Sequence, residues 1–277
     1  MIKMDKKNII AGLGEIGTPI LKLLSENELA IGYDINEDLI NKKKFHKYEK
    51  TQTLMLHICI PFSKKFISNV QKLVRKFDPQ IVVVHSTVSP RTTSTLQSKL
   101  AIPIIYSATR GVHKRKFDKY QPHKNGILFD IMRYTKFFAI SDNAPNKIFA
   151  IKEFKKSMKT NGVKTKQMST PETLELGKII CDTSYYGWLI NYAQLSNMIA
   201  TQYNVDYDEM WTFSDEIHEM LGNRPKMFPG FIGGHCVIPN LDLMQNQTLN
   251  LIKSINDQYS KQVKNSKNIY KNYTKKT

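Results

Sequence analysis

The feature that most constrains the fold is a glycine-rich turn near the N-terminus. Gly12, Gly14 and Gly17 form the pattern G-x-G-x-x-G between the apolar run "NIIA" and the segment "TPILKLLSE". The pattern alone is weak, but a strand before it and a helix after it are the context in which such glycines let a backbone approach a pyrophosphate. The helix N-terminus then stabilises the phosphate charge. We therefore predict a dinucleotide site that includes Gly12, Gly14, Glu15, Ile16 and Gly17.

An acidic residue follows at the end of the next strand-like run. The segment "LAIGYD" ends at Asp34, where a carboxylate accepts hydrogen bonds from both ribose hydroxyls and repels a 2′-phosphate. This position predicts NAD rather than NADP as the cofactor. The alternative is a glycine turn that binds no cofactor.

Strands and helices alternate along the first half of the chain. Strand-like runs at "TLMLHICIP", "QIVVVHST" and "IPIIYSA" are separated by segments with helical spacing, such as "SKKFISNVQKLVRKF". The strand-like run "KFFAIS" and a helix over 144–160 follow, and long helical patterns then run over 171–203 and 206–221. Regular alternation predicts a parallel sheet covered on both faces. The predicted fold class is α/β, a Rossmann-type doubly wound parallel sheet followed by a mainly helical domain with a long central helix.

We predict a division into an NAD-binding domain over 1–168, a helical dimerisation domain over 169–253 and a basic tail over 254–277. The 277 residues, of which 41% are hydrophobic, can bury a substantial core. The sequence has no apolar run long enough to span a bilayer, and its start has no cleavable signal pattern. A cytoplasmic protein is expected.

The formal net charge of +17 suits an anionic partner. The lysines are spread along the chain, and the sequence has no helix-turn-helix, zinc-finger or RNA-binding aromatic motif. A small anionic substrate is therefore favoured over nucleic acid. Cys59, Cys181 and Cys236 are odd in number and far apart, which favours free thiols over disulfides or a metal site.

Four segments resemble, in the correct order, the nucleotide-sugar 6-dehydrogenase family, typified by UDP-glucose and GDP-mannose dehydrogenases. They are "HICIPF", "HSTVSPRTT", "ETLELGKIICDT" and "FIGGHCVIPN", and the similarity covers most of 8–242. Four ordered motifs are more specific than any one of them. The resemblance implies that Pro61, Ser86 and Thr87 belong to the cofactor site, with Thr87 also close to the chemistry.

The resemblance also implies a mechanism. Members of the family oxidise a primary alcohol twice, and a cysteine attacks the intermediate aldehyde, so that the second oxidation gives a thioester. Cys236 holds that position, and Lys178 would stabilise the developing oxyanion through its charge. Gly233 and Gly234 would let the backbone approach the substrate. The alternative for Cys236 is a buried structural thiol.

The sequence departs from the family at two sets of residues. Asp182 and Asn240 stand where the family has Asn and Asp, a reciprocal exchange that keeps one base in the site unless the two substitutions are unrelated. The family's glutamate after the fifth strand is replaced in "SATRGVH", so hydrolysis of the thioester loses its usual carboxylate. Arg110 and His113 in this segment are candidates to clamp a phosphate or carboxylate of the substrate. The alternative is a solvated basic loop.

A further departure is that the chain ends soon after Asn240, without the family's second nucleotide-binding domain. We expect a truncated, divergent member. Arg224 matches an arginine that in the family reaches the substrate of the dimer partner, so a homodimer is predicted. The predicted function is NAD-dependent oxidation of a hydroxyl of an anionic, sugar-derived substrate, such as a nucleotide sugar or a sugar phosphate. The alternatives are a two-electron dehydrogenase of the β-hydroxyacid type and a non-catalytic NAD-binding module.

Overall fold

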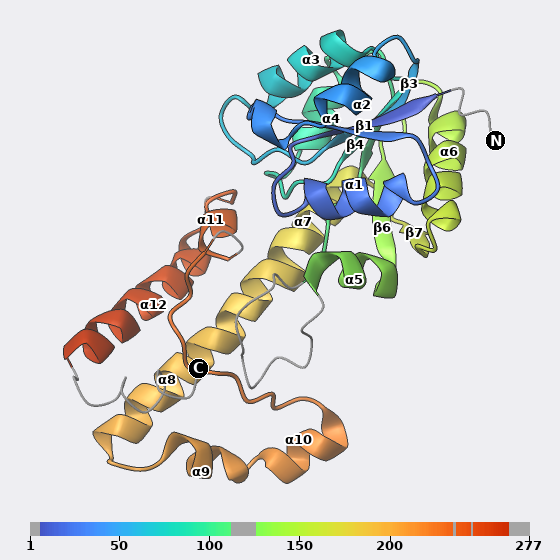
Figure 1. The fold of residues 1–277 in the computed structure, drawn as a ribbon. Helices are drawn as coiled ribbons and strands as arrows, with labels where there is room; N and C mark the ends of the chain where they lie inside the picture. The colour runs from blue at the N-terminus through green and yellow to red at the C-terminus, as the bar shows by residue number, and fades with distance from the viewer. Residues whose placement is uncertain (1–5, 112–125, 235–236, 245, 266–277) are drawn as a thin grey trace. The chain divides into compact units, whose positions relative to one another are not determined.

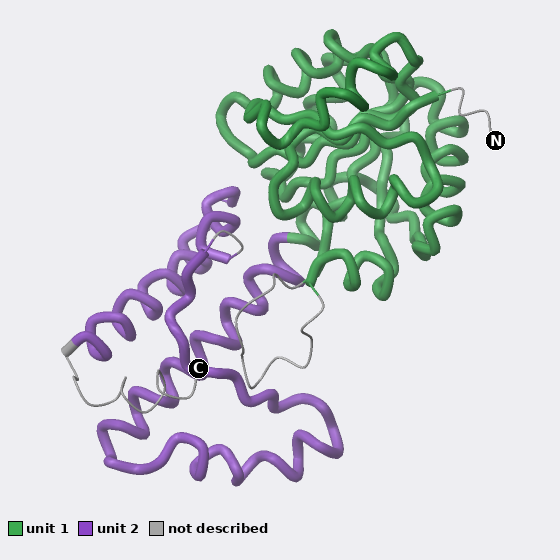
Figure 2. Tube along the Cα trace, in the orientation of Figure 1, with its two compact units in different colours: residues 1–114, 123–178 green, residues 115–122, 179–277 purple. Residues whose placement is uncertain are grey.

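The computed structural model describes residues 6–111, 126–234, 237–244 and 246–265. The chain divides into two compact units (Figure 2). The first unit comprises residues 1–114 and 123–178, and the second comprises residues 115–122 and 179–277. The division into domains at 168 and 253 stays a prediction.

In the described part of the first unit, seven strands form one sheet (Figure 1). The strands are β1 Lys7–Ala11, β2 Ala30–Tyr33, β3 Thr53–Ile58, β4 Ile81–Val84, β5 Ile104–Tyr106, β6 Lys136–Ile140 and β7 Thr165–Gln167. Their order in the sheet is β2-β1-β3-β4-β5-β6-β7. β1 to β5 are all parallel, with Ile9 of β1 opposite Ile31 and Leu56. The inner strands are apolar on both sides, as strands covered on both faces must be.

The prediction of a parallel sheet is right for β1 to β5 and wrong for the pair β5 and β6. β6 is antiparallel to β5, and β7, which the sequence did not predict, is parallel to β6. β6 begins at Lys136, beside the carboxyl end of β5. The Lys136 Nζ donates a hydrogen bond to the carbonyl of Ser107, the residue that follows β5, at 3.0 Å. β6 therefore starts at the same end of the sheet at which β5 finishes. A parallel pairing would need a crossover that brings the chain back to the opposite end of the strands.

Helices cover both faces of this sheet. On one face α1 Gly17–Ser25, α5 Gly126–Arg133 and α6 Lys147–Thr160 share a core that includes Ile10 and Phe154. On the other face α2 Lys42–Lys47, α3 Phe66–Phe77, α4 Thr92–Gln97 and α7 Pro171–Gly177 share a core that includes Ile9 and Phe66. A 3₁₀-helix, η1, covers Glu37–Leu39. The doubly wound arrangement is thus confirmed.

The predicted long helix over 171–203 is continuous, but it changes type. α7 passes into a π-helical segment, η2 Lys178–Ser184, and then into α8 Tyr185–Gln202. The second unit also contains α9 Tyr207–Thr212, α10 Asp215–Leu221, α11 Ile238–Leu241 and α12 Gln247–Asn265. The single helix predicted over 206–221 is therefore wrong, because the chain turns between α9 and α10 and leaves Phe213 92% exposed.

α12 extends beyond the residue at which the basic tail was expected to begin. Asn256, Tyr259 and Val263 are buried at helical spacing, where α12 packs against α8. The Asn256 Oδ1 accepts hydrogen bonds from the Gln194 Nε2 at 2.9 Å and from the Ile232 backbone N–H at 2.8 Å. Residues 254–265 therefore belong to a packed helix. Its lysines lie between the buried residues that face α8.

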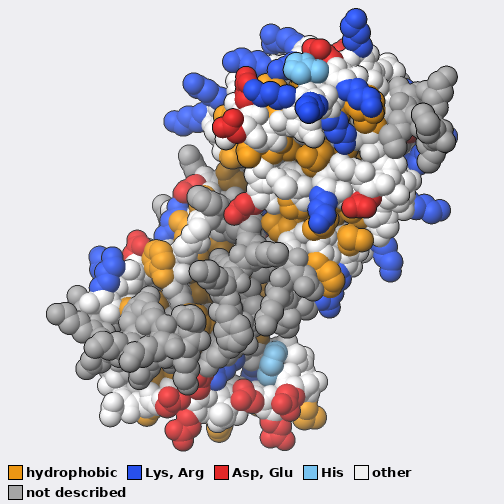
Figure 3. All heavy atoms as spheres, viewed as in Figure 1, with side chains coloured by type: hydrophobic (Ala, Val, Ile, Leu, Met, Phe, Trp, Pro, Cys, Tyr) orange, Lys and Arg blue, Asp and Glu red, His pale blue; other side chains and the backbone are white. Residues whose placement is uncertain are grey.

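The two units carry different charges on the face shown in Figure 3. Lysine and arginine side chains are frequent over the first unit, and acidic side chains gather over α9 and α10 of the second unit. The acidic residues of α9, its N-cap and α10 are Asp206, Asp208, Glu209, Asp215, Glu216 and Glu219. Among the helices of the described residues, none combines the length and the apolar character that a membrane crossing requires.

Candidate cofactor-binding site

The glycine turn between β1 and α1 has the shape of a phosphate cradle. Gly12 has φ +94°, and a Cβ there would lie 2.9 Å from the carbonyl oxygen of Cys59. A Cβ on Gly17 would lie 1.7 Å from the oxygen of Gly12, whereas a Cβ on Gly14 would meet no atom within 4 Å. Gly12 and Gly17 are therefore required by the turn itself. Gly14 leaves open space just before α1, and the predicted role of this space in binding a pyrophosphate stays a prediction.

Asp34 lies beside this turn at the end of β2. Its Oδ2 accepts a hydrogen bond from the Leu13 backbone N–H at 2.6 Å, and its Oδ1 accepts one from Asn36 at 2.9 Å. The Gly12 N–H donates to the carbonyl of Tyr33 at 2.8 Å. The carboxylate is thus held next to the turn, the position that a ribose-binding carboxylate needs.

The loops that follow β3 and β4 are joined at the same edge of the sheet. Ser86 is buried, and its Oγ donates to the Ile60 carbonyl at 2.6 Å, which fixes the loop that presents the exposed Pro61. Thr87 is half-buried next to it. We call this edge, where β1 to β5 end, the carboxyl edge. The structure brings all predicted cofactor residues to it, namely Gly12, Gly14, Glu15, Ile16, Gly17, Asp34, Pro61, Ser86 and Thr87.

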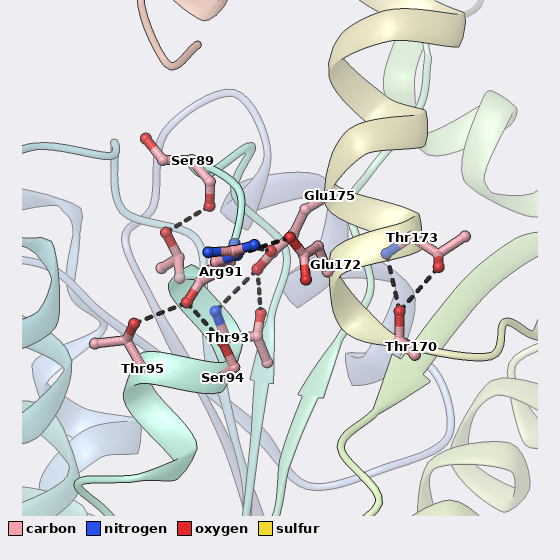
Figure 4. A network of polar contacts seen from close by, with 10 residues as sticks. Ser89, Arg91, Thr93, Ser94, Thr95, Thr170, Glu172, Thr173 and Glu175 are labelled. Carbon is pink, nitrogen blue, oxygen red and sulfur yellow. Dashed lines mark hydrogen bonds and ion pairs between the residues drawn. The ribbon is translucent and has the colours of Figure 1, made fainter. Parts of the chain in front are cut away.

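A buried glutamate joins α7 to the start of α4 (Figure 4). Glu175 is fully buried and accepts hydrogen bonds from the Arg91 N–H at 2.6 Å, the Thr93 N–H at 2.9 Å and the Thr93 Oγ1 at 2.7 Å. Burial raises the pKa of Glu175, and these hydrogen bonds oppose the rise. Sequence reasoning missed this residue, although it lies in "ETLELGKIICDT". Glu175 could have been found from the sequence as an acidic residue at a position of the helix that faces the core.

Lys178 follows in the same helical segment, at the point where α7 becomes π-helical. π-helical turns are rare and frequent at functional sites. The half-buried Lys178 lies close enough to Lys136 to lower the pKa of that residue. Since Lys136 lies at the carboxyl edge, Lys178 is also near this edge. Glu175 therefore fixes the helix that presents the predicted catalytic lysine.

Arg110 lies at the same edge, after β5. Its Nη2 donates to the Thr135 carbonyl at 2.7 Å, and its guanidinium lies 4.8 Å from the centre of the Phe137 ring. These contacts hold the half-buried side chain on the first unit, and its role as a substrate clamp stays a prediction. His113 and Cys236, predicted as substrate clamp and nucleophile, lie outside the described residues.

The other predicted catalytic and substrate residues belong to the second unit. Asp182 is half-buried in η2, and Asn240 is half-buried in α11. Gly233 and Gly234 precede α11, the latter with φ +74°. Arg224 is exposed, and its Nη1 donates to the Asn223 Oδ1 at 2.7 Å. The roles assigned to these residues stay predictions.

A row of buried polar groups crosses the carboxyl edge, and sequence reasoning missed it. His57 and His85 are bonded ring to ring at 2.9 Å, and His85 and Lys136 both contact the Ser107 carbonyl. The available signal was a histidine in each of two otherwise apolar strand segments. Among the described residues, no group of three or more His, Cys, Asp or Glu side chains is arranged to hold a metal ion.

No protein-family model matches the sequence, and a comparison with curated proteins finds no match. Solved structures do match. The UDP-D-ManNAc dehydrogenase from Pyrococcus horikoshii is 15% identical, with a TM-score of 0.67 over 91% of this chain and 68% of that one. A UDP-N-acetyl-mannosamine dehydrogenase from S. aureus is 17% identical, with a TM-score of 0.60 over 93% of this chain and 70% of that one.

A smaller enzyme is also similar. The 3-hydroxyisobutyrate dehydrogenase from Mycobacterium tuberculosis is 11% identical, with a TM-score of 0.60 over 93% of this chain and 94% of that one. At these identities the likeness shows the fold. That fold is a mostly parallel Rossmann-like sheet followed by a helical region.

Proposed function

We propose that the chain is an NAD-dependent oxidoreductase that oxidises a hydroxyl group of an anionic, sugar-derived substrate. The observation that carries the proposal is the open space at Gly14 beside the fixed carboxylate of Asp34. Together these features suit a pyrophosphate and an unphosphorylated adenosine ribose. When bound, the nicotinamide accepts the hydride.

The residues of the chain would bind the substrate and stabilise its charge. The Lys178 ammonium would stabilise the negative charge that develops on the substrate oxygen as the hydroxyl loses its proton. Arg110 and His113 would bind an anionic group of the substrate, because guanidinium and imidazolium groups suit phosphate and carboxylate. A nucleotide sugar or a sugar phosphate has both the hydroxyl and the anionic group.

A second oxidation would need the cysteine segment. The Cys236 thiolate would attack the aldehyde carbon, and the resulting thiohemiacetal would lose a hydride to become a thioester. Asp182 would then take a proton from the water that releases the acid, and Asn240 would hold the same water or a substrate hydroxyl. The motif around Cys236 supports this step, as does the likeness in fold to the UDP-N-acetyl-mannosamine dehydrogenases.

The second candidate function is a single, two-electron oxidation of a β-hydroxyacid. It is favoured by the match with 3-hydroxyisobutyrate dehydrogenase, which extends over nearly the whole of both chains. Such a reaction would use Lys178 and leave Cys236 without a chemical role. A non-catalytic NAD-binding module is the remaining alternative.

We further propose that the protein is a cytoplasmic homodimer joined through α8. The exposed apolar side chains Tyr192, Leu195 and Ile199 of α8 recur at helical spacing on one face, which Tyr203 continues at the C-cap. An apolar face of this kind suits a self-complementary interface. Arg224 would then reach the partner's substrate.

The purified protein, mixed with NAD and a panel of nucleotide sugars, sugar phosphates and β-hydroxyacids, tests the function through the absorbance of reduced cofactor. Two reduced cofactors per substrate support the sugar dehydrogenase, and one supports the β-hydroxyacid reaction. Lys178→Ala should abolish turnover with unchanged NAD affinity, and Lys72→Ala, an exposed lysine on α3, should change neither. NAD binding without turnover on any substrate supports the binding module, and absence of NAD binding contradicts the proposal.

A further inference from the structure

The buried row at the carboxyl edge is the most unusual polar feature of the first unit. We define it as His57, His85, the carbonyl of Ser107, Lys136 and Thr109. The His57 Nδ1 and the His85 Nε2 are 2.9 Å apart, and the His85 Nδ1 is 3.1 Å from the Ser107 oxygen. The Lys136 Nζ is 3.0 Å from that same oxygen and 3.3 Å from the Thr109 Oγ1. All five residues are buried.

The donors and acceptors of the row can be assigned from the Ser107 carbonyl. A carbonyl oxygen only accepts, so the His85 Nδ1 and the Lys136 Nζ both donate to Ser107. The neutral His85 then accepts at Nε2 from the Nδ1–H of His57. The planes of the two rings are nearly parallel, with an interplanar angle of 13° and centroids 5.2 Å apart. Because two donors converge on the carbonyl, protons cannot pass along the row, and a proton that Lys136 gains or loses is exchanged separately from the histidines.

Lys136 is the member of the row that changes charge near neutral pH. Burial lowers the pKa of Lys136 to about 7, with further lowering by Arg110 and Lys178 and an opposing effect of the Cys59 thiol. Burial lowers the pKa of His57 to about 3 and that of His85 well below its usual value. Both histidines are therefore neutral when Lys136 titrates.

The groups around Lys136 leave its charge weakly compensated. His57 and Cys59 face it from β3 and the loop after β3, and His85 faces it from the loop after β4. Arg110 acts on it from the loop after β5, and Lys178 acts from the end of α7. Among the described residues, the groups that shift its titration include two cations and no carboxylate. Among the described residues, the ammonium donates hydrogen bonds to the Ser107 carbonyl and the Thr109 hydroxyl. One more positive charge nearby would favour the neutral form of Lys136.

We propose that Lys136 makes the cofactor site sensitive to the charge of the nicotinamide, so that the oxidised cofactor binds to the form with neutral Lys136 and releases its proton to solvent. This inference rests on the proposed function. Ligands of open α/β sheets bind outside the carboxyl ends of the strands, and the row is buried at those ends. The nicotinamide ring is positively charged when oxidised and neutral when reduced, so only the oxidised cofactor is repelled by the Lys136 ammonium. Lys136 would then influence cofactor binding through its charge and take no part in the chemical step.

Calorimetric titration of NAD and NADH over about pH 6 to about pH 8 tests the proposal. If the oxidised cofactor lowers the pKa of Lys136 by at least one unit, its Kd should be about fivefold higher at about pH 6 than at about pH 8, while the Kd of NADH stays constant. Titration in two buffers of different ionisation enthalpy should show proton release with NAD alone. In Lys136→Met both effects should disappear, and in Lys155→Met, an exposed lysine on α6, both should remain.

A second variant covers the case in which Lys136→Met does not fold. Thr109→Val removes one acceptor from the Lys136 ammonium, so the inflection of the NAD affinity curve should move to lower pH. The same pH dependence for both cofactors, or an unchanged dependence in both variants, overturns the proposal. Absence of binding of either cofactor to the wild type overturns the proposed function as well, so the two failures are distinguishable.

Discussion

The carboxylate of Glu175 in α7 accepts hydrogen bonds from both the backbone N–H and the hydroxyl of Thr93 in α4, at 2.9 and 2.7 Å. Its other oxygen accepts from the Arg91 N–H at 2.6 Å. A carboxylate thus satisfies backbone donors at the start of a helix that is distant in sequence. The contact fixes α7, and with it Lys178, to the first unit.

Glu175→Gln should destabilise the first unit. The amide keeps one acceptor oxygen and places an NH2 group against either the Arg91 N–H or the Thr93 N–H and hydroxyl, which donate to different oxygens of the carboxylate. One set of donors therefore loses its acceptor, and the free energy of unfolding should fall by about 1 to 3 kcal/mol. Urea denaturation followed by circular dichroism measures the change. Glu172→Gln is the matched control, because Glu172 pairs with Arg91 near the surface and should change stability by about 0.5 kcal/mol or less. Equal effects of the two substitutions would contradict the assigned role of Glu175.

Substitutions in the glycine turn should separate folding from cofactor binding. The Cβ of Gly14→Ala meets no protein atom, so this variant should fold with wild-type stability and lose at least about tenfold in NAD affinity through the lost phosphate space. Gly17→Ala places a Cβ 1.7 Å from the Gly12 oxygen and should destabilise the fold. Thermal denaturation and calorimetric NAD titration measure the two effects. Wild-type NAD affinity in Gly14→Ala would show that no pyrophosphate occupies this space.

Asp34 should select NAD over NADP. Its carboxylate is held at the turn by the Leu13 and Asn36 N–H groups, where it would repel a 2′-phosphate. The wild type should bind NAD at least about tenfold more tightly than NADP, a difference of about 1.4 kcal/mol. Asp34→Ala should reduce this preference, mainly through weaker NAD binding. Fluorescence or calorimetric titration with both cofactors measures the ratio, and a preference of the wild type for NADP would remove the NAD assignment.

The pair His57 and His85 should make the first unit sensitive to acid. Burial lowers the pKa of His57 from 6.5 to about 3 and that of His85 well below 6.5, so below about pH 6.5 the unfolded chain binds protons that the folded chain does not. Stability should therefore fall as the pH falls, by up to about 1.4 kcal/mol per pH unit for each histidine. Urea denaturation between about pH 7 and about pH 5 measures the slope.

The matched variant is His57→Leu/His85→Leu, which removes both titrating rings and leaves the Ser107 carbonyl its bond from Lys136. Its stability should depend less on pH over the same range than that of the wild type. Parallel curves for the two proteins would mean that the histidines are not buried as neutral rings.

The glycine turn between β1 and α1 was predictable because its determinants are local, and its role in binding a cofactor stays a prediction. A strand, a glycine turn and a helix occupy one short stretch, and Gly12 and Gly17 are required there by backbone conformation and close contacts within that stretch and with the next strand. Asp34 was predictable because a strand-end carboxylate follows the same unit at a regular distance. The continuous apolar strands likewise identified the doubly wound sheet.

What the sequence did not predict depends on which segments become neighbours. β6 pairs antiparallel with β5, and the sequence did not show this because hydrophobic periodicity is the same for a strand in either direction. The break between α9 and α10 leaves Phe213 exposed, against its apolar character. The lysines of α12 suggested a basic tail, because the sequence does not show that Asn256 and Tyr259 are buried against α8.

The sequence by itself determined the class of fold and the place of the glycine turn, because backbone geometry and hydrophobic period act over neighbouring residues. Only the tertiary structure decided that Glu175 holds the helix of Lys178 and that His57, His85 and Lys136 meet across the sheet. These residues are far apart in the sequence, and the order of the strands in the sheet brings them together. The alternation of strands and helices along the chain does not determine that order. Their pKa values and charges follow from that burial, because desolvation and neighbouring charges are properties of the folded site rather than of the residue types.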